Sequence, residues 1–499
     1  MRRILTLAAL LLVAWSAVHA YSFKSGELCY NITSNNTVAV TFERNTDASS
    51  SLSAYSNLGG ELIIPETVYN GGRAYSVTAI TDYAFYRCSL ITSISISKTV
   101  QTIGIFAFYN TNATSITFGS GSVLTEIGQQ AFDLASFTAV AIPNSVTTIG
   151  NSAFSRSALV TANIPTSIQN LGTGVFASSS SLSNVTLPNG LQEIPQNMFG
   201  GCSSLTSINL PASLTTINRS AFRASGLTSI TIPNGVTTID QSAFDESQLT
   251  SLTIPSSVTT IGYDAFRKTK LTSVTIPSSI TSIGSDAFGY ITTLKTANIQ
   301  NSIISEKEFS YCTNLKEVTI GNNVTTIGNK PFQGCTSLET LNISSSVAVD
   351  INQYFSDNKP TLKTVKVENT VTTIPENAFL NFVALEKVTI PATITSIGNS
   401  AFKGCTAMRE FYSLMDRPIT IDASVFQDVP VDGYCDLHVP TGSKVRYENK
   451  AVWKDFVMIF EDAGSGGGST SGVRGDVNDD GKVDISDVNI VINLMLGKE

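Results

Sequence analysis

The chain is 499 residues long, more than one hydrophobic core usually organises, so it holds either several domains or one elongated array. Charged residues make up 14% of it, about half the usual share, and the formal net charge is −8. No run of Lys and Arg offsets this acidity, so the sequence lacks the basic surface that nucleic-acid binding requires.

The first twenty residues have the features of a secretory signal peptide. Arg2 and Arg3 give a positive start, residues 4–13 are apolar but too few to span a bilayer, and a Val-His-Ala tripeptide precedes Tyr21. No later apolar stretch approaches the ~20 residues of a membrane helix. We therefore expect an exported protein, secreted or at the cell surface of a bacterium, that does not span the membrane.

Residues 21–75 are predicted to form an N-terminal β cap. The stretch Thr-Val-Ala-Val-Thr-Phe at 37–42 is interpreted as a strand of this cap. A repeat array needs such a cap, because its first coil would otherwise expose the core.

A repeat with a period of 21 to 24 residues occupies residues 76–430. Each copy ends in a Phe, at positions 85, 108, 132, 154, 176, 199, 222, 244, 266, 288, 309, 332, 355, 379, 402 and 426. Self-similarity at so fixed a period indicates a solenoid.

The physical reading of one copy, Leu227–Phe244, supports this assignment. A short strand is predicted at its start, with Leu227, Ile230 and Ile232 on one side. Ser229 and Thr231 are expected on the other side. Pro233 ends the strand, because proline cannot donate to a ladder. Val236 and Ile239 direct a second extended segment inward, and Phe244 is large enough to fill the space between coils. One coil cannot bury its apolar side alone, but stacked coils bury a continuous core.

The Leu-x-x-Ile-x-Ile pattern resembles leucine-rich repeats. The longer motif Ile-Pro-x-x-Val-Thr-Thr-Ile-Gly-x-x-Ala-Phe-x-x-Cys is similar to the BspA-type leucine-rich repeat family, with examples at Ile142–Phe154, Ile254–Phe266 and Ile276–Phe288. The resemblance covers about residues 60–430 and implies a β-rich, right-handed solenoid with short strands. The motif is altered at 308–309, 331–332 and 350–355, so we expect the curvature to change between residues 300 and 370.

Five of the seven cysteines share one repeat position, three residues after the periodic Phe: Cys88, Cys202, Cys312, Cys335 and Cys405. Most other copies hold Ser, Gly or Thr there, which favours a small buried residue over a disulfide. A disulfide between Cys312 and Cys335, in adjacent copies, stays open as an alternative.

Residues 431–462 are predicted to close the array, with a strand at 435–440 and an aromatic lid at 451–456, features similar to the ends of exported BspA-type proteins. Residues 463–472 are rich in Gly and Ser and are expected to form a flexible linker.

The segment 473–499 predicts a calcium-binding loop followed by a helix. Counted from Asp476, oxygen-bearing side chains fall at loop positions 1, 3, 5, 9 and 12, Gly481 allows the sharp turn at position 6, and position 7 offers its backbone carbonyl. The predicted ligands are Asp476, Asn478, Asp480, Lys482 through its carbonyl, Asp484 and Asp487. An acidic solvated tail is the alternative.

Loop and helix together resemble one repeat of a type I dockerin. That resemblance implies Ca²⁺ as the bound ion and a cohesin-like partner, contacted by Ile485 and Ser486 at loop positions 10 and 11. Dockerins normally hold two such repeats and this sequence carries one, so we expect metal binding and folding of the tail to be coupled.

Residues for catalysis are not found in a usable arrangement. His438 is the one histidine after residue 20, and a packed or surface role is expected for it in the closing strand. Asp240, Asp245 and Glu246 surround one copy and are interpreted as surface charge, because neighbouring copies add no further acids to make a carboxylate pair. Neither Ser-His-Asp nor zinc chemistry has the residues it needs, and we expect a protein that is not an enzyme.

The exposed side of the first segment is the predicted ligand face, where polar side chains should align in successive copies: Ser207, Asn209, Ser229, Thr231, Ser251, Thr253, Ser273 and Thr275. Ser and Thr also suit exposed strands that bind nothing, and that alternative stays open. The preferred function is adhesion or interaction with an extracellular or cell-surface protein or glycan, as implied by the BspA-type family, which includes surface proteins that bind matrix proteins. The alternative is a non-catalytic part of a polysaccharide-degrading, cellulosome-like assembly attached through the tail.

Overall fold

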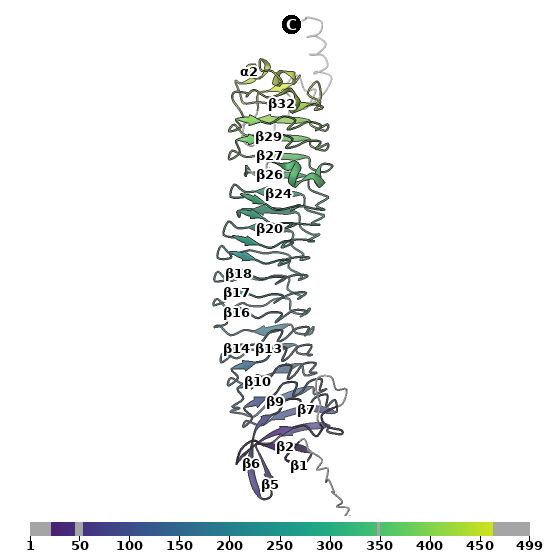
Figure 1. The fold of residues 1–499 in the computed structure, drawn as a ribbon, viewed down its shortest axis with the longest axis vertical. Helices are drawn as coiled ribbons and strands as arrows, with labels where there is room; N and C mark the ends of the chain where they lie inside the picture. The colour runs from purple at the N-terminus through teal and green to yellow at the C-terminus, as the bar shows by residue number, and fades with distance from the viewer. Residues whose placement is uncertain (1–20, 45–52, 347–349, 463–499) are drawn as a thin grey trace, which may run out of the picture. The chain divides into compact units, whose positions relative to one another are not determined.

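The computed structural model describes residues 21–44, 53–346 and 350–462 (Figure 1). The chain falls into two compact units, residues 1–365 and 366–499, which are described separately. The expected signal peptide, linker and calcium loop lie outside the described residues. Within those residues, no helix has the length and apolar character needed to cross a membrane.

The first unit begins with a group of antiparallel strands. β1 (Phe23–Ser25) pairs with β2 (Leu28–Ile32), β2 with β3 (Thr37–Thr41), and β5 (Thr67–Asn70) with β6 (Arg73–Ile80). β3 also lies parallel to β6, which in turn pairs with β8 (Thr102–Ile103) of the first coils. Three consecutive apolar residues of β3 are buried, so this group covers the end of the core.

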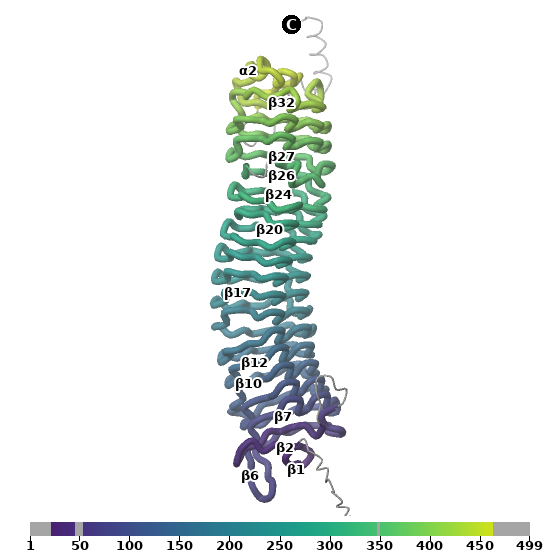
Figure 2. The backbone as a smooth tube through the Cα atoms, viewed as in Figure 1, coloured from purple at the N-terminus to yellow at the C-terminus, as the bar shows by residue number. Residues whose placement is uncertain are grey.

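The rest of the first unit is a stack of coils, one for each copy of the repeat (Figure 2). Each coil contributes two short extended segments. The strands of the first segment are β4 (Gly60–Ile64), β7 (Ile91–Ile96), β9 (Ser115–Phe118), β11 (Ala139–Val140), β13 (Thr161–Asn163), β15 (Asn184–Thr186), β20 (Ser273–Ile276), β22 (Thr296–Ile299), β24 (Glu317–Ile320) and β26 (Thr340–Ile343).

The second segment forms its own parallel ladders. After β8 these comprise β10 (Glu126–Ile127), β12 (Thr148–Ile149), β14 (Asn170–Leu171), β16 (Glu193–Ile194), β17 (Thr216–Ile217), β18 (Thr238–Ile239), β19 (Thr260–Ile261), β21 (Ser282–Ile283), β23 (Ile303–Ile304) and β25 (Thr326–Ile327). The Ile-Gly step that follows many of these strands has a steric reason. Gly150 donates to the carbonyl of Ile127 in the preceding coil, and a Cβ at Gly150 would lie 2.5 Å from the amide nitrogen of Gln129.

The periodic Phe residues form the centre of the core. In the first unit, thirteen of them, from Phe85 to Phe355, stack ring on ring with centroids 4.7 to 5.9 Å apart and rings within 17° of parallel. Each is at most 1% exposed. The predicted solenoid is confirmed, with the Phe side chains filling the space between coils as expected.

A strand was predicted at the start of the copy Leu227–Phe244, and this prediction is wrong because no hydrogen-bonded strand forms there. Leu227 and Ile232 are buried while Ser229 and Thr231 are exposed, as predicted, yet no strand is formed in this stretch. The backbone bonds that join these segments are single ones, from Thr228 N–H to the Thr206 carbonyl and from Thr250 N–H to the Thr228 carbonyl, each 3.1 Å. The second-segment ladder from β16 to β21 is unbroken in the same coils, so ladder pairing on one side and apolar packing on the other hold them together.

Two departures from the repeat lie where the motif is altered. The fully buried Glu308 takes the place that Ala occupies in most copies, and its carboxylate accepts a 2.6 Å bond from the Ser305 amide. Further on, the helix α1 (Ile351–Tyr354) and the turn η2 (Ser356–Asn358) stand where the Ile-Gly step is missing.

The second unit continues the repeat and ends in a different kind of cap. β27 (Thr364–Val367) spans the boundary, β28 (Thr373–Ile374) pairs with β30 (Ser396–Ile397), and β29 (Lys387–Ile390), β31 (Glu410–Ser413), β32 (Asp436–His438) and β33 (Ile459–Phe460) form a parallel ladder. Phe379, Phe402 and Phe426 stack, the last within η3 (Ala423–Phe426). After α2 (Lys444–Glu448), η4 (Trp453–Asp455) places the fully buried Trp453 against Phe426, which closes the apolar core.

Candidate binding surface

The predicted ligand-face residues all lie exposed on the first segment of their coils. Ser207, Asn209, Ser229, Thr231, Ser251, Thr253, Ser273 and Thr275 are each in the exposed class. Within the described part of the chain, none of these eight side chains is engaged in a hydrogen bond. We call this set, together with its continuation along β20 to β26, the strand face.

The strand face continues beyond the eight predicted residues, and apart from Glu317 the residues of this continuation were not predicted from the sequence. The ladder from β20 to β26 places Ser273 beside Thr296, Glu317 and Thr340, and it places Thr275 in line with Asn298, Thr319 and Asn342. The side-chain amide of Asn342 is already hydrogen-bonded, since it donates to Glu317 at 3.0 Å and to Thr319 at 3.3 Å. The signal was available, because these positions keep the same spacing from the strand's buried residues as Ser273 and Thr275.

A second column of polar side chains lies along the second segment of the coils, but its hydroxyls already donate hydrogen bonds to the main chain. Thr147, Thr215, Thr237, Thr259 and Thr281 each donate to a main-chain carbonyl of the preceding coil at 3.0 to 3.4 Å. We call this column the threonine spine. Its hydroxyls tie one coil to the next, so they are less available to a ligand than those of the strand face.

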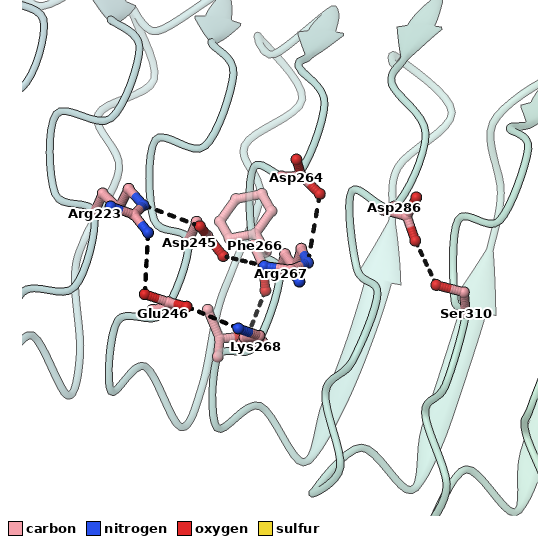
Figure 3. A network of polar contacts seen from close by, with 10 residues as sticks. Arg223, Asp245, Glu246, Asp264, Phe266, Arg267, Lys268, Asp286 and Ser310 are labelled. Carbon is pink, nitrogen blue, oxygen red and sulfur yellow. Dashed lines mark hydrogen bonds and ion pairs between the residues drawn. The ribbon is translucent and has the colours of Figure 1, made fainter.

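A third polar group lies beside the Phe stack, where Figure 3 shows charged side chains of three consecutive coils facing one another. Arg223 contacts Asp245 at 3.2 Å and Glu246 at 3.3 Å, and Lys268 contacts Glu246 at 2.8 Å. Arg267 lies 3.5 Å from Asp245. We call these five residues the charged edge.

Asp245 is buried, which corrects its interpretation as surface charge. Its residue is 4% exposed, and burial raises the pKa of its carboxyl while the hydrogen bond from Arg223 and the charge of Arg267 oppose that rise. The basic partners of Asp245 lie in the neighbouring copies, so the acids of one copy did not reveal them. The ion pairs of the charged edge join neighbouring coils, which gives these charges a structural role, although Asp245 Oδ1 is buried and accepts no hydrogen bond from the described residues.

Two tyrosines extend the charged edge along the array. The Arg267 guanidinium lies 4.8 Å from the ring centre of Tyr290, and the Tyr290 ring stacks on Tyr311 at 4.9 Å. Beyond Tyr311 comes Gly334, where an added Cβ would lie 2.7 Å from that ring. Both rings are nevertheless partly exposed, Tyr290 to 37% and Tyr311 to 41%.

The cysteines at the shared repeat position are packed as small buried groups. The thiols of Cys202, Cys312, Cys335 and Cys405 each donate to the carbonyl of the preceding coil's Phe at 3.1 to 3.2 Å, and all seven cysteines are free and buried. Burial raises the pKa of Cys312 to about 12 and that of Cys335 well above its ordinary value. The thiols are therefore protonated and unreactive in the folded array.

His438 is packed among aromatic rings in the second unit. Its ring stacks on Tyr412 at 4.2 Å and on Phe460 at 5.4 Å, and Nδ1 is hydrogen-bonded to Asp462 at 2.7 Å. This is the packed role expected from the sequence. The predicted calcium ligands and the partner-binding pair Ile485 and Ser486 lie beyond the described residues, and the described part contains no group of three His, Cys, Asp or Glu placed to hold a metal.

Comparisons with known proteins match this chain to leucine-rich repeat proteins. A family model described as the BspA type leucine rich repeat region, in 6 copies, matches residues 74–183, 170–295 and 283–409. A crystal structure of a leucine-rich repeat protein from Bacteroides ovatus ATCC 8483 is 25% identical, with 79% of this chain and 94% of that one covered and a TM-score of 0.60.

Two further structures align with lower TM-scores. A leucine rich cell surface protein from Faecalibacterium prausnitzii A2-165 is 26% identical over 73% of this chain and 93% of its own, at a TM-score of 0.42. The pneumococcal vaccine antigen PcpA is 16% identical over 88% of this chain and 98% of its own, at 0.43. No curated protein matches the chain.

Proposed function

The chain belongs to the BspA-type leucine-rich repeat family, and on that premise we propose that it is an exported, non-catalytic binding protein whose strand face recognises an extracellular protein or glycan. No catalytic family is indicated by the comparisons. Export is proposed from the signal-like residues 1–20.

One observation supports the strand face over the other polar surfaces. The threonine spine uses its hydroxyls between coils, and the charged edge pairs its charges between coils. The eight side chains from Ser207 to Thr275 are exposed and engaged with no other described residue. Aligned donors and acceptors that are repeated from coil to coil suit an extended polar ligand, the kind that repeat arrays commonly bind.

A binding screen with matched variants tests this proposal. The purified full chain is screened against extracellular-matrix proteins and an array of glycans, together with the double variant Ser229→Lys/Ser251→Lys. The variant should lose the ligand, because two long cations would stand in the open polar column. Gln248→Lys, an exposed position off the strand face, should bind as the native protein does. Absence of any ligand, or equal binding by the double variant, would contradict the proposal.

The tail carries a second candidate function, attachment to a larger assembly. The oxygen spacing at Asp476, Asn478, Asp480, Lys482 (carbonyl), Asp484 and Asp487 supports a Ca²⁺ site, with Ile485 and Ser486 proposed to contact a cohesin-like protein. In that case the chain would be a non-catalytic part of a polysaccharide-degrading assembly.

A pull-down from envelope extract of the source cells separates the two functions. The full chain and a version ending at Gly472 are each used with calcium and with chelator. Capture of a cohesin-like protein by the full chain with calcium, and by neither form otherwise, would support attachment through the tail. Equal capture by both forms would assign the binding to the repeat array.

A further inference from the structure

The first ladder of the array has an open edge at β4. β4 is the terminal strand in the order β4-β7-β9, and it pairs in parallel with β7. Neighbouring residues in a parallel ladder direct their backbone groups to opposite sides, and the Ile64 carbonyl accepts from the Ser97 amide on the β7 side. The N–H and C=O groups of Glu61 and Ile63 therefore point away from β7, and among the described residues these four groups have no hydrogen-bond partner.

A groove of about 430 Å³ adjoins this edge. Its lining comes from β4, from β5 and from the turn between β1 and β2 with the start of β2. Its floor is apolar and almost fully covered, made of Leu28, Tyr30, Leu62 and Val68. Its rim includes Ile63 and Tyr69, which are 57% and 67% exposed, unusually high fractions for large apolar side chains.

The groove has an acidic character that nothing beside it neutralises. Glu27 and Glu61 are among its lining residues, and no Lys or Arg lines it. The basic residues of the flanking strands are engaged elsewhere, since Lys24 pairs with Glu43 at 2.9 Å and the Arg73 guanidinium lies over the Tyr75 ring. Within the described chain, neither Glu27 nor Glu61 forms an ion pair.

We propose that this groove binds an extended peptide segment of alternating apolar and basic residues, which adds to the free edge of β4 as a further strand. Exposed edges are the usual template for such strand addition, in which main-chain bonds supply affinity and side-chain pockets supply selectivity. Side chains of an added strand alternate between two faces. Apolar ones would enter the covered floor, and basic ones would lie near Glu27 and Glu61.

The test uses a synthetic hexapeptide of alternating Val and Lys, blocked at both ends, and the full chain. We expect saturable binding by fluorescence anisotropy, and roughly tenfold weaker binding when alternate peptide nitrogens are methylated, since methylation removes the donors of the added strand. Ile63→Pro should weaken binding similarly. It removes an N–H that faces away from β7, which an edge strand tolerates. Ile63→Thr, which keeps that N–H, is the matched control and should bind within a few-fold of the native protein.

Charge provides an independent readout. Glu61→Lys should lose the Val-Lys peptide and favour a Val-Glu peptide of the same length. Equal binding of methylated and unmethylated peptides, no binding of either, or no effect of Glu61→Lys would overturn the proposal. If Ile63→Pro fails to fold, the binding of methylated and unmethylated peptides to the native protein still tests the proposal. The double variant Ser229→Lys/Ser251→Lys should bind the hexapeptide normally, so this site and the strand face can fail separately.

Discussion

Phe266 lies in the middle of the first unit's ring stack, 5.4 Å from Phe244 and 5.2 Å from Phe288. Phe266→Ala should lower the free energy of unfolding of its region by roughly 3–5 kcal/mol, as truncation of a buried aromatic does. Limited proteolysis and thermal melting measure the effect. Tyr263→Ala, in the same coil but 60% exposed, is the control and should change little. Unchanged protease resistance in Phe266→Ala would show that the stack of Phe rings does not hold the coils together.

Glu308 makes stability depend on pH. Burial raises its pKa to about 8, from an ordinary value of 4.5, so the unfolded chain ionises first as pH rises. The folded state is therefore most favoured below about pH 4.5, and it loses up to a few kcal/mol of that advantage between pH 4.5 and 8. Glu308→Gln keeps an acceptor for the Ser305 amide and should remove this part of the pH dependence.

Melting temperatures at pH 5 and pH 8 check this prediction. The native protein should lose more stability over that interval than Glu308→Gln does. Glu306→Gln, at an exposed neighbouring position, should behave as the native protein. Identical pH slopes for the native protein and Glu308→Gln would mean that the carboxyl of Glu308 reaches water in the folded state.

At the scale of elements, the threonine spine and the strand face should respond oppositely to the same chemical change. Thr237 donates to the Thr215 carbonyl at 3.3 Å, so Thr237→Val should cost about 0.5–1.5 kcal/mol of stability and leave ligand binding intact. Thr231→Val, on the strand face, should leave melting nearly unchanged and weaken the ligand. Chemical denaturation and the binding assay measure both, and the reverse outcome would exchange the roles of the two columns.

Much of each element could be predicted from the sequence. The period fixed the place of the Phe stack, and the pattern at 227–232 correctly placed its first and last residues in the core and its hydroxyl side chains outside, although Ile230 is only half-buried. It could not tell a hydrogen-bonded strand from an extended segment held by its apolar side, because both produce the same alternation. The charged edge was missed for a different reason: Arg223 and Asp245 are partners only when one coil stacks on the next.

The candidate binding surface could also be predicted only in part from the sequence. Repeat spacing was sufficient to place Ser229 and Thr231 on one face, and continued further it would have found Thr296 and Asn298. Which polar column remains open to a ligand depends on bonds between coils, and no pattern within one copy reveals them. The open edge of β4 depends on how the first coil meets the antiparallel strands before it, where the repeat does not apply.

At the scale of the whole molecule, calcium should act on the tail and leave the array unchanged. We expect the full chain to bind Ca²⁺ with a dissociation constant on the order of 10⁻⁴ to 10⁻³ M, typical of extracellular modules. Isothermal titration calorimetry should show a heat of Ca²⁺ binding for the full chain, and this heat should disappear in Asp480→Ala and in a chain ending at Gly472. The melting of the array should be equal with calcium and with chelator. Calcium heat retained by the shortened chain would place the site elsewhere.

The central claim, that the strand face is the surface that binds, can be tested by thiol footprinting. All seven native cysteines are buried, so a maleimide probe should label an introduced thiol selectively. Ser229→Cys, Thr237→Cys and Glu246→Cys place that thiol on the strand face, the threonine spine and the charged edge of adjacent parts of the array. With the ligand from the binding screen at saturation, labelling should slow several-fold in Ser229→Cys and stay unchanged in the other two. Protection of Thr237→Cys or Glu246→Cys, with none of Ser229→Cys, would contradict the account.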